Sequence, residues 1–346
     1  MARIISAALQ LKRTGLASMS NIYTPPQAAA YALEAVERMS KSETRGIALD
    51  LPEIRDYFAP VMPGQLVSII AQTSNYKSSF MRGWERMYAN QLMAEGREDE
   101  SIIHVSVEEV VEEQVYQEIA ALSDEDAGRL AHGRVQDWDK LKAAAVMVGQ
   151  IPIYRIGDSL ARPETYANLH STNIIESIQE LVSGAVTGMK VKPAGIFVDY
   201  LQALPFDPGA PRDRRLQVKQ DIYRLRKMGV IFDCGVITAV QAKQNLQGAP
   251  SQDFRMPGIY DGEESSSIAQ RSDRVIQLWM PKMTHGIGTV INHNDFNFVV
   301  TEDMLWVTIG KQRGGLPSGK SWLCKINHTD GSIVPQAVSK ISLKGL

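Results

Sequence analysis

The stretch that decides the fold is LVSIIAQTSNYKSSF, residues 66–80. Its apolar start has the length of a buried strand, a short polar loop follows, and a Lys-Ser pair then begins a helical stretch. This is the layout of a phosphate-binding loop, in which Lys77 would contact phosphate and the Ser78 hydroxyl would contact magnesium. The loop lacks both glycines of the usual GxxxxGK[ST] pattern, and Tyr76 replaces the second one. An ordinary first turn of a helix is the alternative, so the rest of the chain has to decide.

The composition is that of a globular protein with one main domain. Of the 346 residues, 44% are hydrophobic and 22% are charged. The net charge of −2 excludes a protein-wide basic field, so any contact with nucleic-acid phosphates needs a local patch. Cys234 and Cys324 lack CxxC spacing, which favours core thiols in a reduced, cytoplasmic protein over a disulfide scaffold or a zinc site. The chain has no apolar run of about eighteen residues and no clear signal segment, which also favours the cytoplasm over a membrane.

Short apolar runs alternate with helical stretches through the middle of the chain. Such runs are typical of buried parallel strands joined by crossover helices, so we expect an α/β sheet covered on both faces. The predicted strands are residues 67–71, 102–107, 151–156, 195–200, 235–240 and 274–279, and the predicted crossover helices include Ser79–Ala94, Thr172–Gly184 and Arg215–Met228.

The two ends of the chain differ from this pattern. Pro25–Ser42 has the spacing of an amphipathic helix with proline at its start, which predicts an N-terminal arm, residues 1–45, that contains one helix. Residues 46–346 then form the main domain. Near the C-terminus, Phe296–Lys325 reads as three strands with short turns, which predicts antiparallel hairpins that extend the sheet edge.

Polar side chains follow four of the predicted strands. The first strand runs into the loop Ser74–Ser79, the second into Glu108 and Glu109, the fourth ends at Asp199 and the fifth at Gln241. Ligands of open α/β sheets bind beyond the carboxyl ends of the strands, so these side chains are candidates for one nucleotide site. The residues predicted to bind the nucleotide are Ser74, Asn75, Tyr76, Lys77, Ser78, Ser79, Asp199 and Gln241.

Each of these candidates has a functional and a structural interpretation. Asp199 follows four apolar residues and would hold magnesium with Ser78; the alternative is a strand-end cap. Glu108 or Glu109 would activate water as a general base, with Glu108 favoured; the alternative is an acidic pair at the start of a helix. Gln241 would sense the phosphate through its amide, or it is a hydrogen-bonded surface residue.

Several segments resemble, in order and spacing, the motor domain of replicative DnaB-type helicases. They are MPGQLVSIIAQTSNYKSSF, VSVEE, FVDYLQAL, VITAVQAKQNL, SSIAQRSDRVIQLW and KQRGGLPSG, and the similarity covers roughly Thr44–Lys325. The resemblance implies a RecA-like P-loop NTPase fold and a ring or spiral of six subunits, with ATP and Mg²⁺ at each interface. Single-stranded DNA would pass through the centre. The segment before Thr44 is too short for the family's N-terminal collar domain, which receives primase or loader. The helix Pro25–Ser42 resembles the linker helix that docks on the adjacent subunit, although it would equally pack on its own domain.

The resemblance also implies roles for single residues. Lys77, Ser78, Glu108 and Asp199 would act within their own subunit, whereas Lys311 and Arg313 would reach the γ-phosphate of the neighbour. The family's DNA-facing loops correspond to Pro205–Lys219 and Asn245–Asp261. Basic residues in the first loop would then contact the DNA backbone. The alternative is that they form the exposed basic start of a helix. These residues are Arg212, Arg214, Arg215 and Lys219.

The function predicted from the sequence is an ATP-dependent, DnaB-like DNA helicase or translocase. The missing glycines motivate a second hypothesis, a degenerate RecA-like scaffold that binds DNA or protein with little or no ATP hydrolysis. A RecA-like recombinase or clock-type ATPase is a third, which the segments DYLQ and KQRGG disfavour. If the loop keeps a positive φ at Tyr76, the side chain costs about 1–2 kcal/mol there.

Overall fold

The structure is a computed structural model. It describes residues 23–40, 46–162, 169–208, 212–243, 256–264, 266–293, 296–314, 316–327 and 332–336. The chain divides into two units, Met1–Gly46 and Ile47–Leu346. In the first unit, helix α2 spans Pro25–Ser40; the rest of the predicted arm, residues 1–22 and 41–45, lies outside the described residues.

The second unit is built on one mixed sheet. The described part of this sheet has nine strands in the order β11-β10-β9-β6-β1-β5-β4-β2-β3. Six consecutive strands of the sheet run parallel to one another: β6, β1, β5, β4, β2 and β3. The bounds of these six are β1 Leu66–Ala71, β2 Glu100–Ser106, β3 Ile153–Ile156, β4 Lys192–Asp199, β5 Gly235–Gln241 and β6 Arg274–Trp279. The predicted α/β fold with a mainly parallel sheet is confirmed.

Antiparallel strands extend the sheet beside β6, as predicted. They are β9 (Met304–Gln312), β10 (Lys320–Ile326) and β11 (Ile333–Pro335). The strand predicted at FNFVVTE does not join them: β8 (Phe296–Val299) pairs with β7 (Val290–His293) in a separate two-stranded sheet. This hairpin buries Phe298 against Trp279 and Trp306 in a small cluster of its own, which explains why it leaves the sheet edge.

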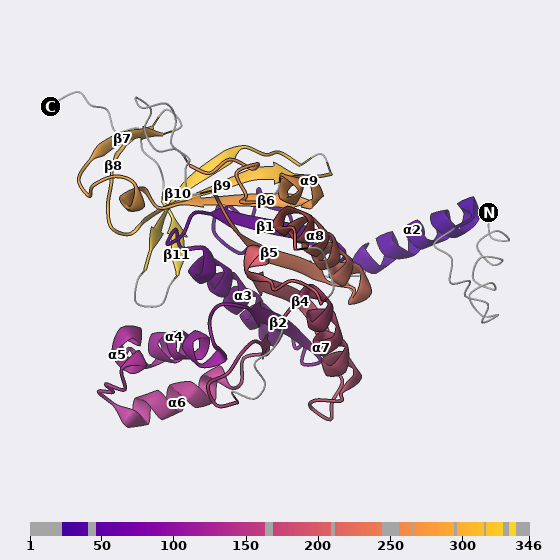
Figure 1. Ribbon diagram of the computed structural model, residues 1–346, viewed down its shortest axis with the longest axis horizontal. Helices are drawn as coiled ribbons and strands as arrows, with labels where there is room; N and C mark the ends of the chain where they lie inside the picture. Colours follow the sequence, from indigo (N-terminus) through magenta and orange to yellow (C-terminus); the bar gives the residue numbers. More distant parts are fainter. Residues whose placement is uncertain are drawn as a thin grey trace. The chain divides into compact units, whose positions relative to one another are not determined.

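Helices cover both faces of the sheet because the strand side chains alternate between two cores. Val67 and Ile69 pack in the core that contains Trp84 of α3 (Lys77–Ala94). Leu66 and Ile70 face the opposite core, which holds side chains of α7 (Ser171–Ser183) and α8 (Arg214–Ile231). Figure 1 shows α3 on one side of the sheet and α7 and α8 on the other. This arrangement places the N-terminus of α3 at the carboxyl end of β1.

A helical segment is inserted between β2 and β3. It consists of α4 (Val111–Ser123), α5 (Ala127–Ala131) and α6 (Trp138–Val148), which pack on one another (Figure 1). Because α4 starts at Val111, Glu108 and Glu109 precede the helix instead of forming its first turn. Three short helices complete the unit: η2 (Leu201–Ala203) follows β4, α9 (Ser267–Arg271) precedes β6 and η3 (Pro281–Met283) follows it. No helix in the described part of the chain is long and apolar enough to cross a lipid bilayer.

Candidate nucleotide site

The loop between β1 and α3 is held in place by Asn75. This side chain is 2% exposed. Its amide nitrogen donates to the carbonyl of Thr73 at 3.0 Å, and its oxygen accepts from the backbone N–H of Met280, just beyond β6, at 2.8 Å. The structure therefore uses the Asn75 side chain, a predicted nucleotide contact, to join the loop to the neighbouring strand.

Two residues of this loop adopt left-handed backbone conformations. The φ angle is 61° at Ser74 and 65° at Tyr76, the residue directly before α3. A side chain in this region costs about 1–2 kcal/mol compared with glycine. The ring of Tyr76 packs against the core on the α3 side of the sheet, which offsets part of that cost. The loop thus keeps a glycine-like turn at Tyr76 without a glycine.

The ammonium group of Lys77 lies among polar groups from three other strand ends. It donates to Gln241 Oε1 at 3.0 Å and lies over the ring of Tyr200, 4.1 Å from the ring centre. Burial lowers the pKa of Lys77, whereas the negative charges of Asp199 and Glu108 act in the opposite direction. These residues follow β5, β4 and β2, and β1, β5, β4 and β2 are consecutive in the sheet. The structure thus brings together the side chains that the sequence placed at these strand ends.

Asp199 has a buried oxygen that is suited to a cation. The residue is 8% exposed, and its Oδ1 atom has no hydrogen-bond partner among the described residues. Ser78 lies in the first turn of α3. Magnesium is typically held by one or two protein oxygens together with water and substrate phosphates, and these two residues fit that donor set. The described residues contain no cluster of three or more His, Cys, Asp or Glu that would hold a metal by itself.

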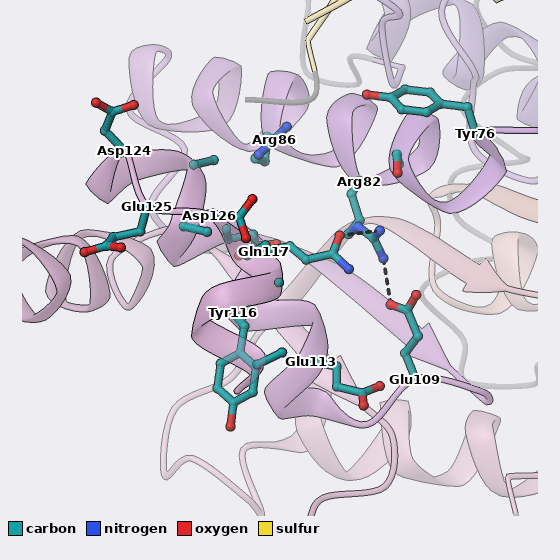
Figure 2. Close-up of a pocket in the computed structure, with 17 residues that line it drawn as sticks. Tyr76, Arg82, Arg86, Glu109, Glu113, Tyr116, Gln117, Asp124, Glu125 and Asp126 are labelled. Carbon is teal, nitrogen blue, oxygen red and sulfur yellow. Dashed lines mark hydrogen bonds and ion pairs between the residues drawn. The ribbon is translucent and has the colours of Figure 1, made fainter. Parts of the chain in front are cut away.

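The two glutamates after β2 have different partners. Glu109 accepts from Arg82 of α3 at 2.7 Å, and the same guanidinium donates to Gln117 of α4 at 2.7 Å. Figure 2 shows the Arg82 side chain pointing toward Glu109, and both residues line a cavity of about 750 Å³ that is also lined by α4 and α5. Glu108 instead acts electrostatically on Lys77 and on Tyr200. Of the two glutamates, Glu108 is therefore the one that belongs to the cluster at Lys77.

Both polar atoms of the Gln241 side-chain amide form hydrogen bonds. Its oxygen accepts from Lys77, and its amide nitrogen donates to Thr73 Oγ1 at 2.8 Å. Gln202 fixes the backbone of the same residue: its oxygen accepts from the Gln241 N–H and its nitrogen donates to the Gln241 carbonyl, both at 3.0 Å. Sequence reasoning missed Thr73, Tyr200 and Gln202 as members of the site. The segment DYLQ, which contains two of them directly after β4, is the signal that would have found them.

Comparison with known proteins supports the fold. No protein-family model matches this chain, and no curated protein does. Among solved structures, a DnaB-like replicative helicase, described with its interactions with primase, aligns with a TM-score of 0.66 and 18% identity over 96% of this chain and 71% of its own. A second solved structure, an ATPase domain, aligns with a TM-score of 0.67 and 20% identity over 89% of this chain and 98% of its own. The chain has the RecA-like fold of these two structures.

Within this RecA-like fold, Lys311 and Arg313 lie far from the phosphate loop of their own chain. Their strand β9 runs antiparallel to β6, and Gln312 pairs with Arg274, the first residue of β6. The phosphate loop contacts Met280, beyond the other end of the same strand. At about 3.3 Å per residue, β6 alone separates the two places by roughly 17–20 Å.

In its own chain, each of these two cations has partners. Lys311 donates to the carbonyls of Ala269 and Ser272 at 2.5 and 2.8 Å. Arg313 pairs with Asp273 at 3.2 Å, and its side chain is 45% exposed. Burial lowers the pKa of Lys311, and the positive charges of Arg313 and Arg226 add to this effect while Asp273 opposes it.

The basic residues of the first predicted DNA loop fall into two groups. Arg214 binds the carbonyl of Leu204 at 2.8 Å and Gln217 at 2.9 Å, so its side chain secures the loop to α8. Arg212, Arg215 and Lys219 are exposed. Arg215 and Lys219 line a surface hollow of about 590 Å³ together with Lys243, Glu263, Glu264 and others. In the second predicted loop, Asn245–Asp261, residues up to 255 lie outside the described residues.

Proposed function

We propose that this chain is an ATP-hydrolysing, DnaB-like DNA helicase or translocase that acts as a ring or spiral of six copies on single-stranded DNA. The observation that carries this proposal is the cluster of Lys77, Glu108, Asp199 and Gln241 at the carboxyl ends of four consecutive strands. A cation, two carboxylates and an amide at that edge of a RecA-like sheet are the groups that phosphoryl transfer to water requires.

Each residue of the cluster has a chemical role in this proposal. Magnesium, held by Asp199 and Ser78, would neutralise charge on the β- and γ-phosphates. The Lys77 ammonium would stabilise the negative charge that develops on the phosphates during transfer. Glu108 would orient a water molecule and accept its proton. Gln241, already bound to Lys77 and Thr73, would exchange these hydrogen bonds when phosphate arrives.

Lys311 and Arg313 would complete the site of a neighbouring subunit. Their position at the opposite end of β6 prevents them from reaching the phosphate loop of their own chain. A guanidinium fork suits a transferring phosphoryl group because it offers several fixed donors. Since Arg313 is partly exposed, it can exchange Asp273 for a phosphate at an interface.

The proposed path for DNA runs along the exposed cations near the start of α8. Arg212, Arg215 and Lys219 lie there, and Lys243 at the end of β5 adds a cation that the sequence prediction did not include. Cations without base-reading groups suit binding to the backbone of a strand in any sequence. Arg214 would position the loop instead of contacting DNA, because its donors are bound to Leu204 and Gln217. A primase or a loader would be a further partner.

Assembly would use α2 of one copy and a groove on the next. The groove, about 760 Å³, lies between α7, α8 and α9, and Leu216, Tyr223 and Ile231 are 50%, 53% and 45% exposed in it. Helix α2 also exposes apolar side chains. Its two glutamates match the basic residues of the groove, which include Lys227. Leu216→Asp is expected to reduce a wild-type hexamer to smaller species in light-scattering chromatography, and an unchanged mass would contradict this docking.

The test of the function is ATP hydrolysis with and without single-stranded DNA. Lys77→Ala, Glu108→Gln and Arg313→Ala are each expected to lower the DNA-stimulated rate about 100-fold or more, because each removes a group that acts in the transition state. Lys142→Ala is a matched control, since Lys142 is exposed on α6. Full activity of the three variants would refute the proposal.

The alternative function is a RecA-like scaffold that binds DNA or protein without turnover. The left-handed Tyr76 and the engagement of Lys77 with Tyr200 and Gln241 are the features that favour it. Isothermal titration with ATP and magnesium separates the two functions. Binding followed by steady turnover supports the motor, whereas absence of binding supports the scaffold.

A further inference from the structure

Arg226 lies beside the two cations that would act on the neighbouring subunit. It comes from the C-terminal half of α8, and its Nη2 atom is 3.3 Å from Asp273 Oδ1. The Nη1 atom of Arg313 lies 3.2 Å from the same oxygen. Two guanidinium groups from separate elements therefore meet on one carboxylate oxygen. Neither the phosphate-loop pattern nor the roles proposed above include Arg226.

Asp273 is a fixed point for both guanidinium groups. Its second oxygen, Oδ2, accepts from the backbone N–H of Leu66 at 3.0 Å. Its backbone N–H donates to the Leu66 carbonyl at 2.8 Å, and its carbonyl accepts from the backbone N–H of Arg313 at 2.9 Å. Asp273 thus joins the first residue of β1 to the residue that follows β9. Its Oδ1 atom is the part of the carboxylate that receives the two arginine side chains.

Asp273 does not neutralise the positive charge around it. The ammonium group of Lys311 lies at the same turn, where it donates to two backbone carbonyls, one of them that of the residue before Asp273. In these contacts three positive charges share one negative charge. Burial lowers the pKa of Lys311, and the charges of Arg313 and Arg226 lower it further. The charge of Asp273 opposes this shift. A group of cations with a net positive charge attracts an anion.

Both arginines are accessible to an anion that approaches from outside the chain. The side chain of Arg226 is 41% exposed and that of Arg313 is 45% exposed, whereas the side chain of Asp273 is 8% exposed. A partly exposed ion pair contributes little free energy, so its cations change partners readily. A phosphate group accepts several charge-assisted hydrogen bonds at once, and two forked guanidinium groups supply such donors in fixed directions.

We propose that Arg226, Arg313 and Lys311 together bind the phosphate of the neighbouring subunit's nucleotide, and that Asp273 holds the two arginines in place until this phosphate binds. This inference rests on the proposed ATPase function and on the assembly of copies that it requires. It adds Arg226 to the cations that stabilise the charge of the transferring phosphoryl group. Asp273 is a positioning residue in this proposal, because it acts through the arginines and not on the nucleotide.

Substitutions of Arg226 test the contribution of its charge. Arg226→Ala is expected to lower the DNA-stimulated kcat about 10-fold, because one of the cations on the phosphate is lost. Arg226→Lys keeps a positive charge and is expected to remain within about threefold of wild type. Arg55→Ala is the matched control, since Arg55 is an exposed arginine that pairs with an aspartate, Asp50, at 3.1 Å. Wild-type kcat in Arg226→Ala overturns the proposal.

A purely structural role for Arg226, as a link between α8 and Asp273, is tested in an Asp273→Asn background. The asparagine keeps an oxygen for the N–H of Leu66 and turns a donor toward the arginines, which releases them, so kcat is expected to stay within about threefold of wild type. Arg226→Ala is still expected to lower kcat about 10-fold in this background, because contact with phosphate does not need the carboxylate. Urea unfolding checks that each variant is folded.

Two results of this cycle would overturn the proposal. If Arg226→Ala has no further effect in the Asp273→Asn background, Arg226 acts only as a link to the carboxylate. If the folded Asp273→Asn chain is inactive, the reaction itself requires the carboxylate. A wild-type chain that hydrolyses ATP at the same rate as Arg226→Ala leaves the proposed function standing without this role. A wild-type chain that hydrolyses no ATP refutes the proposed function, and the role of Arg226 with it.

Discussion

At the scale of single residues, the phosphate loop replaces glycine by side-chain anchoring. Ser74 and Tyr76 hold the positive φ angles, and Asn75 between them is buried and bound to Thr73 and Met280. Each left-handed residue costs about 1–2 kcal/mol, so the turn needs contacts that stabilise it in this conformation. The buried amide of Asn75 supplies two of them, and the packing of the Tyr76 ring supplies a third.

Asn75→Ala is therefore expected to destabilise the protein. The substitution leaves the backbone N–H of Met280 without its acceptor in a buried environment, which costs about 1–3 kcal/mol of unfolding free energy. Lys142→Ala, at an exposed position on α6, serves as the control. Urea unfolding of the two variants measures the difference. Equal stability of Asn75→Ala and wild type would show that the loop does not depend on this anchor.

The residues of the candidate site were predictable only where they follow a predicted strand. Lys77, Glu108, Asp199 and Gln241 follow apolar runs, and parallel strands bring such ends together. The sequence favours Glu108 over Glu109, but the pairing of Glu109 with Arg82, which lies 27 positions earlier in the chain, was not predictable from it. Tyr200 and Gln202 lie in the segment DYLQ, but their contacts with Lys77 and Gln241 depend on packing and do not follow from spacing.

At the scale of elements, polar side chains tie α3 to β2 and its connection. Arg82 binds Glu109 and Gln117, and one turn further along α3, Glu85 binds His104 of β2 at 2.7 Å. Both members of the second pair are 2% exposed. Burial alone would lower the pKa of His104, but the charge and hydrogen bond of Glu85 and the charge of Asp199 outweigh it, and the pKa is raised above its ordinary value of 6.5.

This pair is expected to make stability depend on pH. Because the folded-state pKa of His104 is raised, its contribution is fully present below 6.5 and is lost as the pH rises through the raised pKa. Glu85→Gln breaks the buried pair and is expected to cost about 3–5 kcal/mol near pH 6 and clearly less near pH 9. Urea unfolding at both pH values measures this, with Glu98→Gln, an exposed glutamate, as the control. The same loss at both pH values would contradict the assignment.

The elements themselves were largely predictable because long apolar runs and helical periodicity leave few alternatives. The six parallel strands and the helices α3, α7 and α8 form within a few residues of their predicted bounds. The exception is β8, because its alternation of apolar and polar residues predicted a strand but not the strand with which it pairs. Phe298 finds Trp279 and Trp306, which are remote in sequence, and this burial determines the pairing with β7. Sheet membership of a short strand depends on such contacts, which no local pattern contains.

At the scale of the whole molecule, the two halves of the proposed site lie at opposite ends of the parallel strands. The phosphate loop, Glu108 and Asp199 occupy the carboxyl end. Lys311 and Arg313 lie beside the amino end of β6. A single chain therefore cannot assemble the proposed site by itself. A head-to-tail arrangement, in which the amino end of one copy faces the carboxyl end of the next, brings the halves together, and such heterologous contacts generate rings or spirals.

Mixing two inactive variants tests this arrangement. Lys77→Ala subunits keep Arg313, and Arg313→Ala subunits keep Lys77, so a mixed assembly contains interfaces at which both groups are intact. In a random equal mixture about one interface in four has this composition, which sets the expected recovery of ATPase at up to about one quarter of wild type. The control is a mixture of Lys77→Ala with Glu108→Gln, which recovers nothing because both substitutions lie on the same half of the site. Recovery in neither mixture, with both variants folded and assembled, would place Arg313 outside the site of its neighbour. Recovery in the first mixture alone requires that one copy complete the site of another, since neither chain has both groups.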